Sequence, residues 1–317
     1  MDIIFRTLDF TGKHILPPSS KEIGYISMNG TAENCDIGSF ELVFRDKELE
    51  DFARSHPEGL LVRWGHFEGY FTDFQFTEKQ KTVFGSHINA LTHKIVFPPQ
   101  SITSKDKIED KVKSLINQYA PWLVFDDTGY TDTIDFATET YMHGDKFLKE
   151  YLGKLRWGYR IYTEGKELHF RLVKPETNPL MFSIGNRNIY EITEDFSCKD
   201  AFYGGWYRKT KEDDGTELEE EKWLYITTEE KEGIYKCDTV LNAHSPQAAI
   251  DELKAKKNKH TYLSRTRNVE YNTDYTLGEI IRLQTDGITT TKQIQSIDFW
   301  LEKDTYHEEP VLSEWED

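Results

Sequence analysis

Short runs of aromatic and β-branched residues, separated by glycines and charged turns, occupy residues 38–97. Such runs, with partial alternation of apolar and polar positions, are typical of strands in a small antiparallel barrel or sandwich. The expected strands cover residues 39–44, 59–63, 69–76 and 82–88, with one or two helical turns over residues 47–55. Pro98 and Pro99 end the segment, because a proline ring cannot donate to a sheet. The pattern predicts a first β-barrel domain over residues 1–98.

Beyond the two prolines the apolar positions follow a helical period. Ser104 suits the N-cap of a helix, and Pro121 would stop that helix. The apolar face of this helix consists of Ile108, Val112, Leu115, Ile116 and Tyr119. The sequence therefore predicts an α+β insertion domain over residues 99–180, built from a helix over 104–120, a helix over 145–152 and a hairpin over 156–173 with its turn at residues 164–166.

Strand-like runs resume after residue 181. They cover residues 188–193, 201–208, 222–227 and 233–237, with a dense acidic loop over residues 212–221. Ser245 and Pro246 are typical of a helix start, and they predict a helix over residues 246–257 with Ala249 and Leu253 facing inward. We expect a second β-barrel domain over residues 181–300 and an acidic C-terminal tail over residues 301–317.

The first and third segments contain a weak internal sequence repeat. The run Gly59-Leu-Leu-Val-Arg63 is followed by a second apolar run over residues 69–76, and Gly278-Glu-Ile-Ile-Arg282 is followed by a second run over residues 293–299. If this repeat reflects a repeated structure, two related units flank the insertion. The expected fold is α+β and β-rich, with two small antiparallel β-barrel domains flanking an α+β insertion.

Composition narrows the classes of partner. The formal net charge of the 317 residues is −17, and no cluster of Lys and Arg is large enough to follow a phosphate backbone, so stable nucleic-acid binding is not expected. No apolar window approaches the length of a membrane span, and the first residues do not resemble a signal peptide, so synthesis in the cytoplasm is expected. Cys35, Cys198 and Cys237 are widely separated, which favours neither disulfides nor a zinc site.

The sharpest catalytic lookalike is Asp127-Thr128-Gly129 after an apolar run, as in aspartic proteases. That chemistry needs two carboxylates that share one proton, and the chain contains no second Asp-Thr-Gly or Asp-Ser-Gly. An Asx turn is the favoured interpretation, because Asp and Gly form turns for local reasons.

Other candidate side chains have similar structural explanations. A calcium loop or a glycosidase pair could be drawn from Asp126, Asp127, Asp132, Asp135 and Glu139, but their spacing does not match the calcium loop. The histidines His66, His87, His93 and His169 fall in predicted strands or turns. Sugar stacking could involve Trp64, Trp157 and Trp206, although packing in a core or a subunit interface is favoured. No catalytic, cofactor-binding or metal-binding residue is assigned, and no cofactor is expected.

Four stretches in the same order resemble the siphovirus Gp-thirty-seven-like family of phage tail proteins, which is related to the trimeric baseplate hub. Residues 86–99 are similar to the family element that ends in Pro-Pro, although the paired leucines and the arginine of that element are altered here. Residues 147–173 resemble its helix and hairpin, residues 188–205 its strand before Gly-Gly, and residues 275–299 its closing strand pair. The resemblance covers most of residues 38–300.

The resemblance implies a homotrimer in which two similar barrels per chain imitate six-fold symmetry. Such a hub of a phage or phage tail-like particle (a tailocin) would join the tail tube or the distal tail protein ring to the tail tip, next to a tail spike, fibre or tape-measure protein. It would have no catalytic activity and would be assembled into the virion. Two alternatives stay open from the residues: a tail-tip module that recognises host surface glycans, and a cell-wall hydrolase that uses Asp127 or a neighbouring carboxylate.

Overall fold

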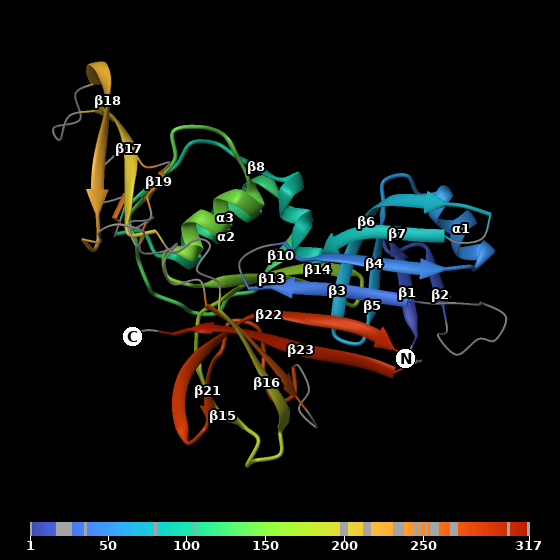
Figure 1. Cartoon of the computed structure of the whole chain (residues 1–317). Coiled ribbons are helices and arrows are strands. Elements are labelled where there is room, and N and C mark those ends of the chain that lie inside the picture. Colours follow the sequence, from blue (N-terminus) through green and yellow to red (C-terminus); the bar gives the residue numbers. More distant parts are fainter. Residues whose placement is uncertain are drawn as a thin grey trace. The chain divides into compact units, whose positions relative to one another are not determined.

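The computed structural model describes residues 2–16, 27–34, 37–78, 81–103, 105–196, 202–211, 217–230, 238–241, 243, 246, 249–250, 253, 260–266, 272–302 and 305–315. The chain divides into two compact units. The main unit comprises residues 1–192 and 264–315, and the minor unit comprises residues 193–263 with the last two residues. Strands dominate both units, so the β-rich α+β class predicted from the sequence is confirmed (Figure 1).

The main unit is built around one large sheet. Its first strands are β1 (Ile3–Thr7), β2 (Lys13–Leu16), β3 (Ser27–Glu33), β4 (Ser39–Phe44), β5 (Leu60–Trp64), β6 (Phe67–Phe76) and β7 (Lys81–His87). Its later strands are β15 (Thr177–Ser183), β16 (Ile189–Phe196, of which residues 189–192 belong to this unit), β20 (His260–Thr266, of which residues 264–266 belong to this unit), β21 (Ile280–Thr285), β22 (Ile288–Glu302) and β23 (Thr305–Glu314). The strand order is β16-β20-β23-β22-β3-β4-β7-β6-β5-β1-β2, and β21 links β15 to β22.

The first strands follow the alternation in the sequence. The run over residues 39–44 coincides with β4, and helix α1 (Lys47–Arg54) begins where the Asp46 side chain accepts a hydrogen bond from Leu49 N at 2.6 Å. The sequence pattern predicts no strand before residue 38. In the structure β1 has alternating buried residues, pairs with β2 and β5, and extends the sheet to its β2 edge.

One pairing joins the first and last parts of the chain. Strand β3 pairs antiparallel with β22, from Glu33 opposite Ser296 to Met28 opposite Leu301. Figure 1 shows the red strands β22 and β23 running beside the blue strand β3. The two predicted β segments therefore share one continuous sheet.

The expected acidic tail over residues 301–317 is wrong for most of its length. Residues 305–314 form β23, which pairs with β22 along its whole length. Val311 and Leu312 are buried, and alternate partners on β22 fix the register. Acidic composition suggested solvent exposure, but the pairing with β22 makes the segment part of the sheet, and the consecutive residues Val311 and Leu312 are buried on its two faces.

The insertion packs its helices against a small sheet. Its helices are η1 (Ile88–Lys94, a 3-10 helix), α2 (Ile108–Tyr119) and α3 (Gly144–Gly153). Its strands are β8 (Val96–Phe97), β9 (Ser101–Ile102), β10 (Leu123–Phe125), β11 (Phe136–Ala137), β12 (Met142–His143), β13 (Gly158–Glu164) and β14 (Glu167–Val173). One core of buried residues includes Val112, Ile116, Phe147, Tyr159 and Phe170 and continues to Leu61 and Tyr70 of the first strands.

The predicted start of α2 was too early. The helix begins at Ile108 with Lys107 at the N-cap, and Ser104 lies outside the described residues. A turn occupies the preceding residues, where Asp106 accepts hydrogen bonds from Thr103 N and Oγ1 at 3.0 and 3.1 Å. These bonds between the Asp106 side chain and Thr103 close a separate turn, and the helix begins after it.

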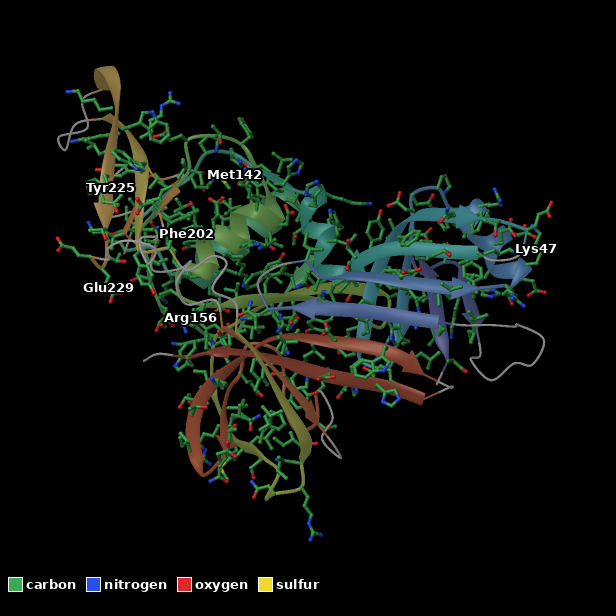
Figure 2. The ribbon with its side chains drawn as sticks, viewed as in Figure 1. Lys47, Met142, Arg156, Phe202, Tyr225 and Glu229 are labelled. Atoms are coloured by element: carbon green, nitrogen blue, oxygen red, sulfur yellow. The ribbon has the colours of Figure 1, made fainter. Side chains whose placement is uncertain are left out.

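Asn34 brings three parts of the main unit together. Its backbone carbonyl accepts from Tyr159 N (3.3 Å), and its own N–H donates to Gln295 O (2.9 Å). Arg156, labelled in Figure 2, has a left-handed backbone (φ 55°), and its carbonyl accepts from Asn34 Nδ2 (3.4 Å) and Gln293 Nε2 (3.1 Å). The insertion hairpin is thereby tied both to the end of β3 and to β22.

The minor unit contains a three-stranded sheet. Its strands are β17 (Gly204–Lys211), β18 (Glu217–Thr227) and β19 (Asp238–Val240), in the order β18-β17-β19. Within the predicted helix over residues 246–257, the described positions 246, 249, 250 and 253 are helical, and Ala249 and Leu253 are buried. The predicted acidic loop is shorter, since β18 begins at residue 217. The predicted strand over residues 233–237, Ser245 and all three cysteines lie outside the described residues.

Candidate functional site

The Asp-Thr-Gly sequence forms a structural loop held by helix α2. Asp127 is exposed, and its carboxylate accepts from Lys113 Nζ at 2.7 and 2.6 Å. The buried Glu109 carboxylate accepts from three consecutive backbone N–H groups, those of Thr128, Gly129 (3.1 Å) and Tyr130. A side chain missed by sequence reasoning thus fixes the loop. An exposed Asp127 in an ion pair with a lysine does not have the shared proton of a protease dyad.

The other candidate carboxylates have separate partners. Asp126 accepts from Tyr162 Oη and lies 3.0 Å from His169 Nδ1, whereas Asp132 accepts from Lys174 Nζ at 2.9 and 2.8 Å. Asp135 and Glu139 are exposed. Among the residues that the structure describes, no group of three or more His, Cys, Asp or Glu side chains is arranged to hold a metal ion.

The candidate histidines are dispersed over the main unit. His66 Nδ1 lies 3.5 Å from Glu308, and His93 bonds to Asp145 (3.0 Å) and stacks on the His143 ring. His87 is buried, and its Nδ1 accepts from Asn89 N at 3.3 Å, which caps η1. Burial and, secondly, the nearby charge of Arg160 lower the pKa of His87 to about 3, so its ring is neutral at physiological pH.

Two of the three candidate tryptophans are core residues. Trp64 is 1% exposed and stacks on Phe67 with ring centroids 4.1 Å apart. Trp157 is 3% exposed and packs edge-on against Tyr130. Of the three, Trp206 alone, at 46% exposure in the minor unit, could stack against a ligand.

Trp206 belongs to an exposed apolar surface of the minor unit. Trp206 is opposite Tyr225 on β18 and Val240 on β19, and Arg208 is opposite Trp223, so these side chains share one face. We define the aromatic face as Trp206, Trp223, Tyr225 and Val240, all exposed. Figure 2 labels Tyr225, whose hydroxyl donates to Asp238 at 2.8 Å. The opposite face carries Tyr207 into the core of the unit.

A second candidate surface is a cationic cavity in the main unit. The cavity has a volume of about 440 Å³ and combines β5, β6, β13 and β14. We define the arginine pocket by its charged lining residues, Arg63, Arg160, Arg171 and Glu68. The described lining thus includes three arginines and one glutamate, in a chain whose net charge is −17.

Glu68 is tightly held in the wall of the arginine pocket. Its carboxylate accepts from Thr163 N at 2.8 Å and Thr163 Oγ1 at 2.6 Å, and it lies 3.7 Å from Arg63 Nε. Burial raises the pKa of Glu68, against the opposing effect of these hydrogen bonds and of Arg63 and Arg6. The two hydrogen bonds tie Glu68 of β6 to Thr163 of β13.

The described helices contain none that is both long enough and apolar enough to span a bilayer. No model of a known protein family matches the sequence, and no curated protein sequence matches it significantly. The fold, by contrast, has clear neighbours among solved structures.

A tail protein from Neisseria meningitidis superimposes with a TM-score of 0.60 and 13% sequence identity, over 99% of this chain and 96% of that chain. The 43 kDa tail protein of prophage MuSo2 from Shewanella oneidensis gives 0.57 and 10%, over 99% and 98%. A prophage tail protein from Listeria monocytogenes gives 0.50 and 13%, over 99% and 94%. These neighbours match along nearly their whole length, and this chain therefore has the fold of phage tail proteins.

Proposed function

We propose that this chain is a non-enzymatic structural hub of a phage tail or tail-like particle, and that three copies join the tail tube or distal tail ring to the tail tip. The fold shared with three tail proteins supports a structural tail role. We also propose that the chain belongs to the narrower siphovirus family named above, that it contacts a tail spike, fibre or tape-measure protein, and that it is assembled into the virion. The proposed domains are residues 1–98, 99–180 and 181–300.

The observation that supports a trimer is a β-hairpin that occurs twice in the chain. Each hairpin has a glycine with positive φ, a short strand and a longer antiparallel partner strand. The two hairpins cover residues 59–76 and 278–299. Two related β units per chain would give a trimer six similar docking units, which is how a three-fold object can match a six-fold tube. Both repeats lie in one sheet, through the β3–β22 pair, so each chain would present them in a fixed arrangement.

Mass in solution and symmetry in the particle test this proposal. We expect a species of three times 37.2 kDa by light scattering, or three-fold density at the tail end of purified particles where trimers form only on assembly. A chain that is monomeric in solution and absent from purified particles would contradict the proposal.

A contact variant sharpens the test. We propose that the aromatic face of the minor unit packs against a neighbouring tail component, because exposed apolar patches of this kind mark interaction sites. Trp223→Asp should reduce incorporation into particles, whereas Trp122→Asp, at an exposed tryptophan of the main unit, serves as the matched control. Equal incorporation of both variants would remove the aromatic face from the assembly interface.

Recognition of a host glycan is the second candidate function. The specific observation in its favour is that Trp206 and Tyr225 lie side by side on an exposed face, with ring centroids 5.2 Å apart. Exposed aromatic rings of this kind offer an apolar surface against which a sugar ring can stack. A glycan array should then show saturable binding that Trp206→Ala abolishes and Trp122→Ala retains. Failure of any glycan to bind would leave the structural role alone.

A further inference from the structure

We propose that the contact between the two β lobes of one chain is repeated between chains, so that the β21–β22 turn of one copy packs against the end of β6 in a second copy. The first lobe comprises strands β3 to β7, and the second lobe comprises β16 and β20 to β23. The partner of this surface is therefore another copy of the same chain. The inference rests on the proposed trimer and names the interface that would hold it together.

The strand order shows which parts of the two lobes correspond. The order is β3-β4-β7-β6-β5 in the first lobe and β16-β20-β23-β22-β21 in the second lobe. In both lobes, the two strands that come first in the chain are followed by the last strand, the long strand and the short strand. Strand β3 therefore corresponds to β16, β6 to β22 and β7 to β23.

The register shifts align the two long strands residue by residue. The shift lies at residues 71–73 of β6 and at residues 294–296 of β22, where each strand pairs with the last strand of its lobe. Counted from the end of each shift, Phe76 of β6 holds the position of Phe299 on β22. Phe299 is buried and Phe76 is partly exposed, so the position that is covered in the second lobe is open in the first.

Inside the chain, the second lobe covers the turn of the first. Phe67, the first residue of β6, is fully buried, and its ring centroid lies 5.4 Å from that of Phe299. His66 of the same turn lies 3.5 Å from Glu308 on β23. Ile288 corresponds to Phe67, because it is the first residue of β22, but it is 68% exposed. The matching contact for Ile288 is Phe76 of a second copy.

Two strand edges match in the same way. Inside the chain, β3 pairs with β22 beyond its register shift, from Ser296 to Leu301. The corresponding pair is β16, whose residues 189–192 belong to the main unit, with residues 73–76 of β6. The pairing of β6 with β5 ends at Phe71, and β16 stands at the end of the strand order. Over the described residues, each of these two edges therefore pairs with a strand on one side only.

The open turn and the open edges belong to one interface. The second lobe of one copy supplies Ile288 and β16, and the first lobe of the next copy supplies residues 73–76 of β6. Such a contact joins different surfaces of two copies, so it continues from copy to copy until a ring closes. Open strand edges and exposed apolar side chains are suited to pairing between chains. In a ring of three copies, each of the six lobes would be covered by the next.

Light scattering over a dilution series of the full chain tests the role of Ile288. Ile288→Asp should raise the protein concentration at which trimers dissociate by about tenfold or more, because a charge replaces an apolar side chain that is buried between copies. Tyr141→Asp is the matched control, since Tyr141 is 71% exposed and belongs to the insertion. The control should assemble like wild type. Circular dichroism checks that both variants are folded.

Cross-linking locates the contact directly. Gln75 is exposed and lies next to Phe76 in β6. A short bis-maleimide should join Ile288→Cys of one copy to Gln75→Cys of the next, when one chain carries both substitutions, and give covalent species of two and three chains. A chain with Ile288→Cys and Tyr141→Cys should give only the background of the native cysteines. Where trimers form only on assembly, the reagent is applied to purified particles.

The interface and the trimer fail in different ways. A trimeric wild type that gives no cross-link between positions 288 and 75 would refute the interface and leave the trimer standing. Trimers of Ile288→Asp that dissociate at the same concentration as wild type would also refute the interface. A wild type that is monomeric both in solution and in purified particles would refute the trimer, and the interface with it.

Discussion

Gly59 and Gly278 both have a positive φ, of 95° and 86°, shortly before the strands β5 and β21. Gly59 precedes the β5–β6 hairpin, and Gly278 stands two residues before the β21–β22 hairpin. The longer partner strand has a register shift in both cases, between residues 71 and 73 of β6 and between 294 and 296 of β22. The weak sequence repeat therefore corresponds to a repeated local structure.

Substitution of either glycine should be costly for two reasons. An alanine Cβ at Gly278 would lie 2.6 Å from Asn34 Oδ1, and one at Gly59 would lie 2.5 Å from Phe71 O. Strain at positive φ and the steric clash together predict a loss of about 2–4 kcal/mol in the free energy of unfolding for each variant. Urea denaturation measures this loss.

Gly287→Ala is the matched control for these two variants. Gly287 also has positive φ (81°), but no atom lies within 4 Å of the position that an alanine Cβ would take, so only the backbone strain remains. We expect a loss of about 1 kcal/mol. Equal losses at all three glycines would show that the close approach to Asn34 and Phe71 has no energetic weight.

Substitutions of Glu109, which holds the Asp-Thr-Gly loop, and of Asp127 within it should have different effects on stability. Glu109→Ala removes the acceptor of three backbone N–H groups and should destabilise the chain by about 2–4 kcal/mol. Asp127→Asn disturbs only an exposed ion pair with Lys113 and should change stability by less than about 1 kcal/mol. Thermal unfolding and hydrogen exchange of Gly129 N would measure the two effects. A large loss in Asp127→Asn, with Glu109→Ala neutral, would contradict the structural role assigned to this loop.

The local sequence pattern was enough to predict a strand where buried and exposed residues alternate along it. The run over residues 39–44 matches β4, and the hairpin around Gly165 falls at β13 and β14. Strand β3 has the polar sequence Ser27-Met-Asn-Gly-Thr-Ala-Glu33, which contains no such signal. Its strand geometry comes from its partners β4 and β22, and β22 is more than 250 residues away in sequence, which no local pattern can reveal.

The candidate surfaces were only partly predictable for the same reason. Trp206 was among the candidates, and the alternation that places Trp223 and Tyr225 on one face of β18 is visible in the sequence. The predicted turn over residues 164–166 would place Arg160 opposite Phe170, but the turn in the structure is residues 165–166, and this shift of one residue places Arg160 opposite Arg171. Arg63 comes from a distant strand, and only the tertiary fold adds it to the pocket.

The last strand provides a test of the corrected C-terminus. Leu312 is fully buried opposite Ile294 of β22. Leu312→Ala should lower the free energy of unfolding by about 2–5 kcal/mol, through lost burial and the cavity left behind. Ser313→Ala, at the next and partly exposed position, should change it by less than about 0.5 kcal/mol. A neutral Leu312→Ala would restore the acidic tail that the sequence suggested.

His87 should make the protein sensitive to mild acid. Its pKa is about 3 in the folded chain and 6.5 as the ordinary value, so below pH 6.5 the unfolded chain binds a proton that the folded chain does not. Stability is therefore retained above pH 6.5 and lost as the pH falls toward 3. At pH 5 the loss from this one residue amounts to about 2 kcal/mol.

His87→Asn isolates this contribution, because asparagine can still accept the hydrogen bond from Asn89 N but does not titrate. Unfolding free energies are compared at pH 7.5 and pH 5 for wild type, His87→Asn and the exposed control His143→Asn. Other titrating groups cancel in the difference between proteins, whatever the variant costs at pH 7.5. The wild type and the control should lose about 2 kcal/mol more than His87→Asn between the two pH values. An equal loss in all three proteins would mean that His87 is protonated in the folded chain, and the burial and the Arg160 charge would then not control its titration.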